Sequence, residues 1–363
     1  MTGLGRVTAR VDANSRVGLG HLRRSQVLLE ELSRRGSSIG FVGSIDSQAA
    51  RAAGPALRNL MYLASPACAA HDPVSDAEES LAALGSPDPS GSWVVVDHYE
   101  LGESWERIVS AAGHRILAID DLRDRPHCAE ILVSDTAEPF SPAVDRWPSG
   151  ALQLLGPSYA LLGPEFNAIE KTVPSPAAGL RLLITFGGAD STREGFKVLQ
   201  ALGDYPGSVA ASLGVGAVDL VLGPACEQRE ELIRQSSALS CVVIHDAPLS
   251  LAPLMYAADL VVTAGGNSLV EALAIGRPCL VIQTAENQAR MVRSLEEESL
   301  ILSLGDHRDV TPESISAGLA RLGAIRLDLA ERLAENPVFD TRGAGRIARA
   351  MEGRSARPTV EIA

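Results

Sequence analysis

Short runs of aliphatic and β-branched residues alternate with longer amphipathic stretches along almost the whole chain. The short runs fit buried strands, and the longer stretches carry apolar residues every three or four positions, as helices do when one face packs on a sheet. Leu22, Val27, Leu28 and Leu32, for example, form one apolar stripe of a helix predicted over 22–35. Alternation of this kind is typical of parallel sheets covered by helices on both faces.

The predicted elements fall into two groups. In the first half we expect strands at 6–11, 39–42, 93–97, 115–120 and 131–134. In the second half we expect strands at 180–185, 219–222, 242–245, 260–263, 279–282 and 301–304, with helices at 193–202, 227–235, 268–275 and 288–297. The pattern predicts an α/β fold made of two Rossmann-like, doubly wound parallel-sheet domains.

A chain of 363 residues is long for a single hydrophobic core, so two domains are expected. The segment 171–179 carries two prolines and several small residues just before a predicted strand, which makes it the expected linker. The N-terminal domain would then cover 1–170 and the C-terminal domain 180–352. Residues 353–363 show no apolar periodicity and are expected to form a loose tail.

The formal net charge of -13 narrows the classes of partner. Nucleic acids and membrane surfaces are met by clustered basic residues, and the only lysines are Lys171 and Lys197. No run approaches about 18 apolar residues, and the N-terminus lacks a signal-peptide pattern. We expect a cytoplasmic protein that binds neither nucleic acid nor membrane; the sequence leaves its oligomeric state open. A small anion is still a possible ligand for this acidic chain, because backbone N–H groups at the start of a helix can bind an anion without basic side chains.

The cysteines are scattered, odd in number and free of any C-x-x-C pair, which favours free thiols in a reducing compartment. They are Cys68, Cys128, Cys226, Cys241 and Cys279. Polar clusters also follow two strands, with Asp97, His98 and Tyr99 in one and Asp120, Asp121, Arg123, Asp124 and His127 in the other. No compact metal-ligand spacing is present, so neither a metal nor a cofactor is expected.

The first glycine turn follows the first predicted strand, in the segment RVDANSRVGLGHLRRS that begins at Arg10. Gly18 and Gly20 permit a tight backbone, and His21 lies where the helix begins. His21 fits a general base, because the positive end of a helix favours an uncharged imidazole that can accept a proton. Two alternatives stay open: an ordinary helix-start histidine, and a dinucleotide fingerprint, which needs a third glycine where Arg23 stands.

A matching turn opens the second half in the segment FGGADS. Gly187 and Gly188 suit a loop that approaches a ligand closely, and Asp190 or Ser191 is available as a helix cap. The turn therefore predicts a second place where a ligand meets the carboxyl edge of a sheet.

The third turn lies in LVVTAGGNSLVEALAIGRPCLVI, which reads as strand, glycine turn, helix and strand. Its N–H groups at the helix start suit a diphosphate; they belong to Gly265, Gly266, Asn267 and Ser268. Glu271 follows about one helical turn later, where a carboxylate can accept hydrogen bonds from ribose hydroxyls. The alternative for Glu271 is a solvated helix face.

The next predicted strand is followed by TAENQA, with three polar side chains at the start of a helix. Glu286, Asn287 and Gln288 can bind sugar hydroxyls or an acetamido group. They can equally act as helix caps.

Seven motifs occur in order along most of the chain. They are R-x-D-A-N-S-x-x-G-x-G-H-L-R-R from Arg10, VVDHY from Val95, IDDLRDRPH from Ile119, LLGPSYALLGPEF from Leu154, FGGADS from Phe186, AGGNSLVEALAIGRP from Ala264 and AENQ from Ala285. In these motifs the chain resembles the PseG family, the UDP-2,4-diacetamido-2,4,6-trideoxy-β-L-altropyranose hydrolases of pseudaminic acid biosynthesis. That family belongs to the GT-B superfamily and is related to MurG. The chain departs from it at Gly163, where the family commonly has a basic residue, and at Ser191, where it commonly has proline.

The resemblance implies a metal-independent hydrolase that binds a UDP-activated amino sugar between its two domains and cleaves the C1–O bond with inversion. It implies that His21 is the catalytic base, that Asp12, Gly18, Gly20 and Tyr99 lie on the sugar side, and that Glu286, Asn287 and Gln288 contact the hexose. It assigns the nucleotide to Gly187, Gly188, the 265–268 loop and Glu271. Two alternatives remain: a GT-B glycosyltransferase that moves the sugar to another acceptor, and a binding module without turnover.

Overall fold

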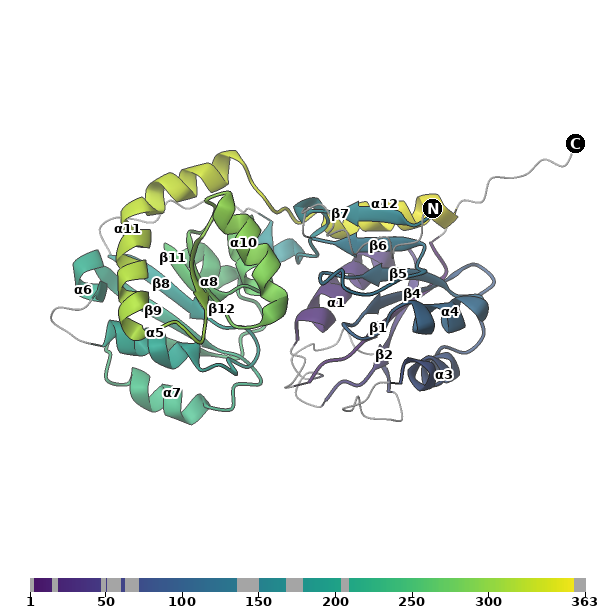
Figure 1. Cartoon of the computed structure of the whole chain (residues 1–363), viewed down its shortest axis with the longest axis horizontal. Helices are drawn as coiled ribbons and strands as arrows, with labels where there is room; N and C mark the ends of the chain where they lie inside the picture. Colours follow the sequence, from purple (N-terminus) through teal and green to yellow (C-terminus); the bar gives the residue numbers. More distant parts are fainter. Residues whose placement is uncertain are drawn as a thin grey trace, which may run out of the picture. The chain divides into compact units, whose positions relative to one another are not determined.

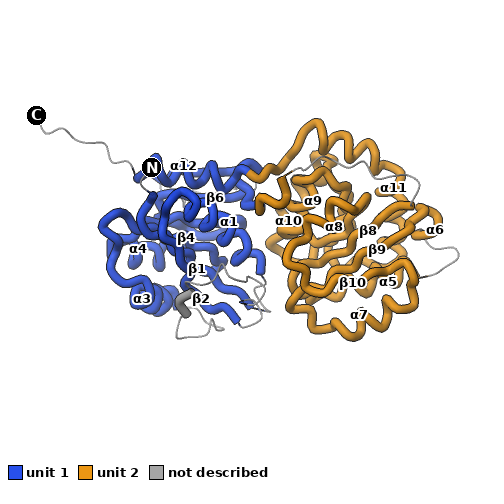
Figure 2. The backbone as a smooth tube through the Cα atoms, turned by 180° about the vertical axis from the view of Figure 1, so that it is seen from behind, with its two compact units in different colours: residues 1–162, 342–363 blue, residues 163–341 orange. Residues whose placement is uncertain are grey.

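The computed structural model describes residues 3–14, 19–46, 50, 60–62, 72–135, 150–167, 179–203 and 209–355. It divides into two compact units, which are coloured separately in Figure 2: unit 1 comprises 1–162 with 342–363, and unit 2 comprises 163–341. Each unit contains one sheet in which all the described strand pairs are parallel. The two-sheet α/β fold predicted from the sequence is therefore confirmed (Figure 1).

The sheet of unit 1 has the strand order β3-β2-β1-β4-β5-β6-β7. Its strands are β1 (Arg6–Val11), β2 (Ser38–Gly43), β3 (Leu60–Tyr62), β4 (Ser92–Asp97), β5 (Arg115–Ile119), β6 (Ile131–Ser134) and β7 (Leu152–Leu155). The chain order reverses beside β1, so β4 lies next to β1 and Val11 pairs with Asp97. Ligands of open parallel sheets bind at the carboxyl edge next to such a reversal.

The helices of unit 1 present apolar faces to this sheet. They are α1 (Gly20–Arg34), α3 (Pro73–Leu84), α4 (Glu103–Ala111) and α12 (Gly343–Ser355), with the short 3-10 helix η3 (Pro157–Tyr159). In α1 the buried face includes Leu22, Leu28, Leu29 and Leu32, which continues the stripe predicted from the sequence. Helix α3 begins after Asp72, whose carboxylate accepts hydrogen bonds from the first-turn amides of Val74 and Ser75.

Helix α12 belongs to unit 1, although the sequence assigns 180–352 to the C-terminal domain. It packs on α1 and η3, and Ala344, Ile347, Ala348 and Met351 join the hydrophobic core of unit 1. The helix also continues to Ser355, past the predicted start of the tail. Apolar spacing shows that a helix has a face to bury, but it does not say against which sheet.

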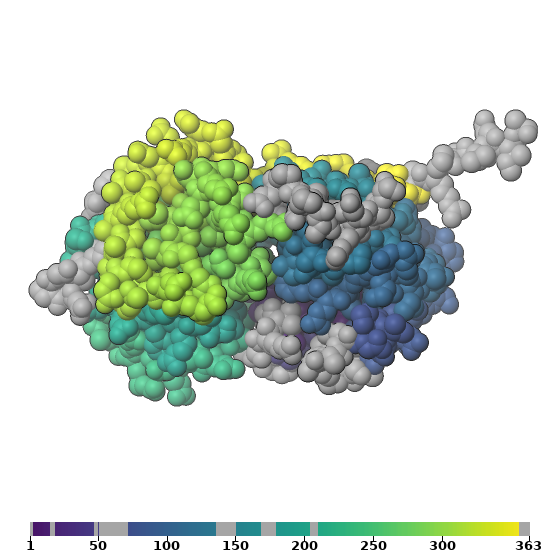
Figure 3. Space-filling view, in the orientation of Figure 1, coloured from purple at the N-terminus to yellow at the C-terminus, as the bar shows by residue number. Residues whose placement is uncertain are grey.

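The sheet of unit 2 has the strand order β10-β9-β8-β11-β12-β13, with its own reversal between β8 and β11. Its strands are β8 (Leu180–Thr185), β9 (Val215–Leu222), β10 (Val242–Asp246), β11 (Leu260–Ala264), β12 (Cys279–Gln283) and β13 (Leu302–Asp306). Its helices are α5 (Glu194–Leu202), α6 (Val209–Leu213), α7 (Arg229–Ser236), α8 (Ala252–Ala257), α9 (Asn267–Ala274), α10 (Ala289–Glu297) and α11 (Pro312–Glu335), with the 3-10 helices η4 (Pro164–Phe166) and η6 (Glu286–Gln288). On the face of unit 2 drawn in Figure 3, the later residues of the unit, in yellow-green, form the upper part and the earlier ones, in teal, form the lower part.

All predicted strands are present, with ends that differ by a few residues. Strands β3 and β7, which span three and four residues, are not predicted from the sequence. Gly18 and most of the predicted linker, 171–178, lie outside the described residues, as does Cys68. The other four cysteines are free thiols. Within the described part of the chain, every helix is too short or too polar to cross a bilayer.

Candidate functional site

Three side chains on one face of α1 converge on the end of β4. His21, Arg24 and Ser25 are spaced by three and four residues, which places them on the same side of the helix. All three contact the carboxylate of Asp97, the last residue of β4. They meet because α1 follows β1, and β1 pairs directly with β4.

The His21 ring is oriented by Asp97. Nδ1 of His21 lies 2.6 Å from Oδ1 of Asp97, and only 5% of the histidine surface is exposed. An ionised carboxylate can only accept a hydrogen bond, so Nδ1 carries the hydrogen in this contact. Nε2 is then the nitrogen that can accept a proton, which is how a histidine is arranged when it acts as a general base.

The surroundings of Asp97 stabilise its charged form. Burial by itself opposes ionisation, but the Arg24 guanidinium and the contact with His21 outweigh it and hold the pKa of Asp97 well below its usual range. Arg24 donates from Nε to Oδ2 at 2.7 Å and from Nη2 to Oδ1 at 2.6 Å, and the hydroxyl of Ser25 donates to Oδ2 at 3.2 Å. Asp97 is therefore a fixed acceptor beneath the imidazole.

Tyr99 and Gly20 lie close to the same imidazole. The Tyr99 ring meets the His21 ring edge to face, with centroids 4.4 Å apart and an interplanar angle of 80°. Gly20 is the first residue of α1, directly before His21. The structure thus brings His21, Gly20 and Tyr99 close together.

Asp12 is fully buried beside this group. Its Oδ1 accepts hydrogen bonds from Arg10 at 2.5 Å and from the Ser44 amide at 2.8 Å, and its Oδ2 lies 3.1 Å from Nε2 of His98. Burial opposes ionisation, yet His98 and Arg10 hold the pKa of Asp12 well below its usual range. Asp12 therefore joins β1 to the ends of its two neighbours, through Ser44 after β2 and His98 after β4.

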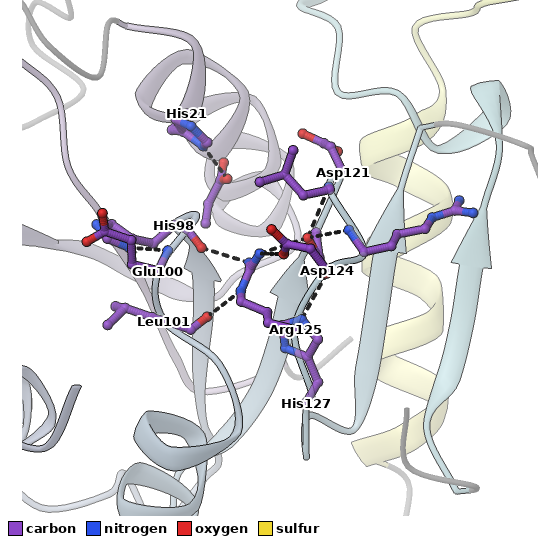
Figure 4. Close-up of polar contacts among 12 residues, drawn as sticks. His21, His98, Glu100, Leu101, Asp121, Asp124, Arg125 and His127 are labelled. Atoms are coloured by element: carbon purple, nitrogen blue, oxygen red, sulfur yellow. Dashed lines mark hydrogen bonds and ion pairs between the residues drawn. The ribbon is translucent and has the colours of Figure 1, made fainter. Parts of the chain in front are cut away.

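A second polar network fixes the loops that follow β4 and β5. Arg125 donates to the backbone oxygens of His98 and Leu101 at 2.8 and 3.0 Å, and to Asp120 at 2.9 Å (Figure 4). His127 lies between Asp120, at 3.0 Å from Nε2, and Glu106, at 2.5 Å from Nδ1. These contacts hold the loop that carries Tyr99 against the loop that begins at Asp120.

In unit 2 the predicted diphosphate loop is tied to the loop that follows β12. Oε1 of Gln288 accepts hydrogen bonds from the backbone N–H of Gly265 at 3.1 Å and of Thr284 at 2.9 Å. Nε2 of Gln288 donates to the Thr284 hydroxyl at 3.1 Å. Gln288 therefore joins the two loops, whereas Glu286 and Asn287 are exposed at the same sheet edge.

Gly265 and Gly266 lack side chains for different reasons. A Cβ at Gly265 would lie 2.4 Å from Cγ2 of Val292 on α10, so packing excludes a side chain there. A Cβ at Gly266 would meet nothing closer than 3.9 Å. Gly266 is the N-cap residue of α9, so no side chain of that residue caps the first amides of the helix. Asn267 and Ser268 lie in the first turn. Glu271 follows on the same helix and is half-buried.

The FGGADS turn follows β8, on the other side of the reversal from β11. Gly187 has a φ of +73°, which a residue with a side chain rarely adopts, and its carbonyl packs against Gly223. The Asp190 carboxylate accepts hydrogen bonds from the amides of Glu194 at 2.8 Å and Gly195 at 2.9 Å, which confirms it as a cap of α5. Burial raises the pKa of Asp190 to about 6 against these hydrogen bonds.

Sequence reasoning finds His21 but not its partners Asp97 and Arg24. Asp97 ends a predicted strand, so it belongs to the same carboxyl edge as the turn before His21. What is absent from the sequence is the strand order that makes β1 and β4 neighbours. Within the described ranges, no group of three or more His, Cys, Asp or Glu is arranged to hold a metal ion.

No protein-family model matches the chain. It is 28% identical over 193 residues to the spore coat polysaccharide biosynthesis protein SpsG of Bacillus subtilis, a match that covers 53% of this chain and 56% of that protein. The chain thus spans about half the length of this relative.

Solved structures match over nearly the whole chain. MurG of Acinetobacter baumannii aligns with a TM-score of 0.63 at 12% identity, over 96% of this chain and 99% of that one. The spinosyn rhamnosyltransferase SpnG, complexed with thymidine diphosphate, aligns with a TM-score of 0.56 at 18% identity, over 96% and 99%. At these identities the similarity shows the fold, which is GT-B-like in both of its sheets.

Proposed function

We propose that the chain transfers a glycosyl group from a nucleoside diphosphate sugar to an acceptor hydroxyl, with inversion at the anomeric carbon. The observation that carries the proposal is the His21–Asp97 contact of 2.6 Å at the carboxyl edge of the unit 1 sheet. The GT-B-like fold and the glycosyltransferase among its structural neighbours support the class of reaction. The partial similarity to SpsG, a polysaccharide biosynthesis protein, supports a role with sugars.

The chemistry assigned to unit 1 is base catalysis. Nε2 of His21 takes the proton from the acceptor hydroxyl as its oxygen attacks the anomeric carbon, and the bond from that carbon to the diphosphate oxygen breaks. Asp97 holds the ring in the tautomer that leaves Nε2 open to a proton and stabilises the imidazolium that forms. Tyr99, which contacts the ring edge to face, is assigned to the sugar side.

The group assigned to unit 2 is the nucleotide. The leaving diphosphate gains negative charge, and amides at the start of α9, from Asn267 onward, are donors suited to stabilising it. Glu271, one turn further along α9, is assigned to the ribose. Exposed Asn287 is assigned to the hexose, and Gln288 positions the loop at Gly265.

Hydrolysis is the second candidate, with water as the acceptor. It is favoured by the seven ordered motifs that resemble the PseG family, whose members hydrolyse a UDP-linked diacetamido sugar. The same base serves both reactions, because His21 would deprotonate water or a sugar hydroxyl in the same way. The donor preferred under this candidate is a UDP-(di)acetamido-deoxyhexose.

The experiment is a mass-spectrometric screen of UDP- and dTDP-sugars in ¹⁸O-labelled water, with and without a panel of sugar acceptors. Transfer predicts a glycoside product that needs the acceptor and carries no ¹⁸O. Hydrolysis predicts free sugar labelled at C1 in the absence of any acceptor. Absence of cleavage of every donor, combined with tight binding of a nucleotide sugar, would contradict both and indicate a binding protein.

A further inference from the structure

Arg24 lies between two carboxylates at the carboxyl edge of the unit 1 sheet. Its Nε and Nη2 donate to the two oxygens of Asp97, at 2.7 and 2.6 Å, and its Nη1 pairs with Asp121, which follows β5. The Arg24 side chain is only 11% exposed. Such a bidentate contact fixes the plane of the Asp97 carboxylate.

The charge of Arg24 bears on the state of His21. Asp97 is fully buried, and a buried carboxylate needs a cation or several donors to remain ionised. His21 could supply that cation only by carrying a hydrogen on both ring nitrogens, and such an imidazolium can no longer act as a base. Arg24 supplies the cation instead, and its Nη2 lies 3.2 Å from Nδ1 of His21, a distance at which a second positive charge is disfavoured.

We propose that Arg24 is a positioning residue for the reaction, which keeps His21 uncharged and oriented by pairing with Asp97 in its place. The inference rests on the function proposed above, because it explains how His21 stays able to accept a proton. Arg24 itself acts through Asp97 and is not assigned a contact with the substrate.

Asp121 holds Arg24 from the side away from Asp97, so the guanidinium is fixed by carboxylates from two strand ends. The charged or titratable groups facing this assembly are Asp97 at the end of β4, Tyr99 after β4, Asp121 and Arg123 after β5, and Asp135 after β6. Burial and the charge of Asp121 raise the pKa of Asp135 to about 7.

The test compares Arg24→Met, Arg24→Lys and a control, Arg34→Met, in the full-length protein. Arg34 lies on the same helix and loses the same charge, but its side chain is 64% exposed and pairs with Glu31. One measurement is the pH dependence of kcat/KM. The other is the ¹⁵N chemical shifts of the His21 ring as a function of pH, which report its tautomer and charge without requiring turnover.

For Arg24→Met we expect the acid limb of kcat/KM and the His21 titration to move to higher pH by about one unit or more. Arg24→Lys keeps the charge but loses the bidentate contact with Asp97. The acid limb of kcat/KM should therefore stay close to that of wild type, while kcat falls roughly tenfold. The control should match wild type in both measurements. Identical His21 titrations in Arg24→Met and wild type would overturn the proposal.

A substitute variant and a measurement that needs no turnover cover the cases in which the first test fails. If Arg24→Met does not fold, Arg24→Gln, which retains an N–H donor without the charge, carries the same expected shift and the same overturning result. If no nucleotide sugar is turned over, the proposed function fails, and the ¹⁵N titration still decides the role of Arg24.

Discussion

The side-chain oxygen of Gln288 accepts a hydrogen bond from the backbone N–H of Gly265 across 3.1 Å, joining the loops that follow β11 and β12. The same oxygen accepts from the Thr284 amide at 2.9 Å. One amide side chain therefore sets the spacing between the turn assigned to the diphosphate and the loop that exposes Glu286 and Asn287. Gln288 would therefore affect ligand binding by setting the positions of these two loops.

Replacing Gln288 by Leu should destabilise unit 2. The change leaves the N–H groups of Gly265 and Thr284 without this acceptor, and an unsatisfied buried donor costs about 1–3 kcal/mol. Urea unfolding followed by circular dichroism measures the loss. Gln288→Glu, which keeps an acceptor oxygen at the same reach, is the matched control and should lose less. Equal losses would show that the two loops do not depend on this hydrogen bond.

Alanine should destabilise the protein more at Gly265 than at the adjacent Gly266. At Gly265 the new Cβ would lie 2.4 Å from Val292, and overpacking of this kind costs about 1–3 kcal/mol. At Gly266 the φ of -104° suits any residue and the nearest atom is 3.9 Å away, so stability should fall by about 1 kcal/mol or less, the usual effect at an N-cap.

The same pair tests the diphosphate assignment. If the backbone at Gly266 approaches the nucleotide, the added methyl group should weaken UDP binding roughly tenfold, equivalent to the loss of one charge-assisted hydrogen bond. Isothermal titration of UDP into both variants measures this. Unchanged affinity in Gly266→Ala would remove that turn from the proposed nucleotide site.

His21→Ala and Asp97→Asn should both lower kcat by roughly 10²- to 10⁴-fold, the range expected for loss of general base catalysis. Asparagine can donate to Nδ1, which would favour the tautomer whose Nε2 carries the hydrogen and cannot accept one. The affinity for UDP should stay unchanged, because the nucleotide is assigned to unit 2. Full turnover in His21→Ala would remove the imidazole from the mechanism.

His127 should make stability depend on pH in the alkaline range. Burial by itself lowers the pKa of His127, but hydrogen bonds to Asp120 and Glu106 outweigh it and raise the value from 6.5 to about 9. A raised histidine pKa stabilises the folded state fully below the unfolded value of 6.5. The contribution falls as pH rises above that value and is lost once pH passes about 9.

The measurement is the midpoint of thermal unfolding between pH 6 and pH 10 for wild type and His127→Gln. Wild type should lose stability across this range by more than the variant, which has no proton to lose at that position. Parallel curves for the two proteins would show that His127 does not carry the expected charge.

The local pattern of the sequence determines the elements and their edges. Runs such as 92–97 and 260–264 are strands because apolar residues fill both faces. The glycine turns that follow strands 6–11 and 260–264 mark the carboxyl edges where His21 and Gly266 lie. These features depend on residues within a few positions of one another, which is why the α/β class with two parallel sheets is predicted correctly. The helix starting before His21 is likewise visible from its apolar stripe.

Only the tertiary structure decides which of these features meet. Asp97 contacts His21 because β4 inserts beside β1, and nothing in the local sequence indicates this contact between residues 76 positions apart. The same holds for Asp12, whose carboxylate contacts Ser44 after β2 and His98 after β4. It also holds for α12, which returns to the core of unit 1. Hydrophobic periodicity specifies that a face is buried; the order of strands in the sheet, set by packing of the whole unit, specifies its partner.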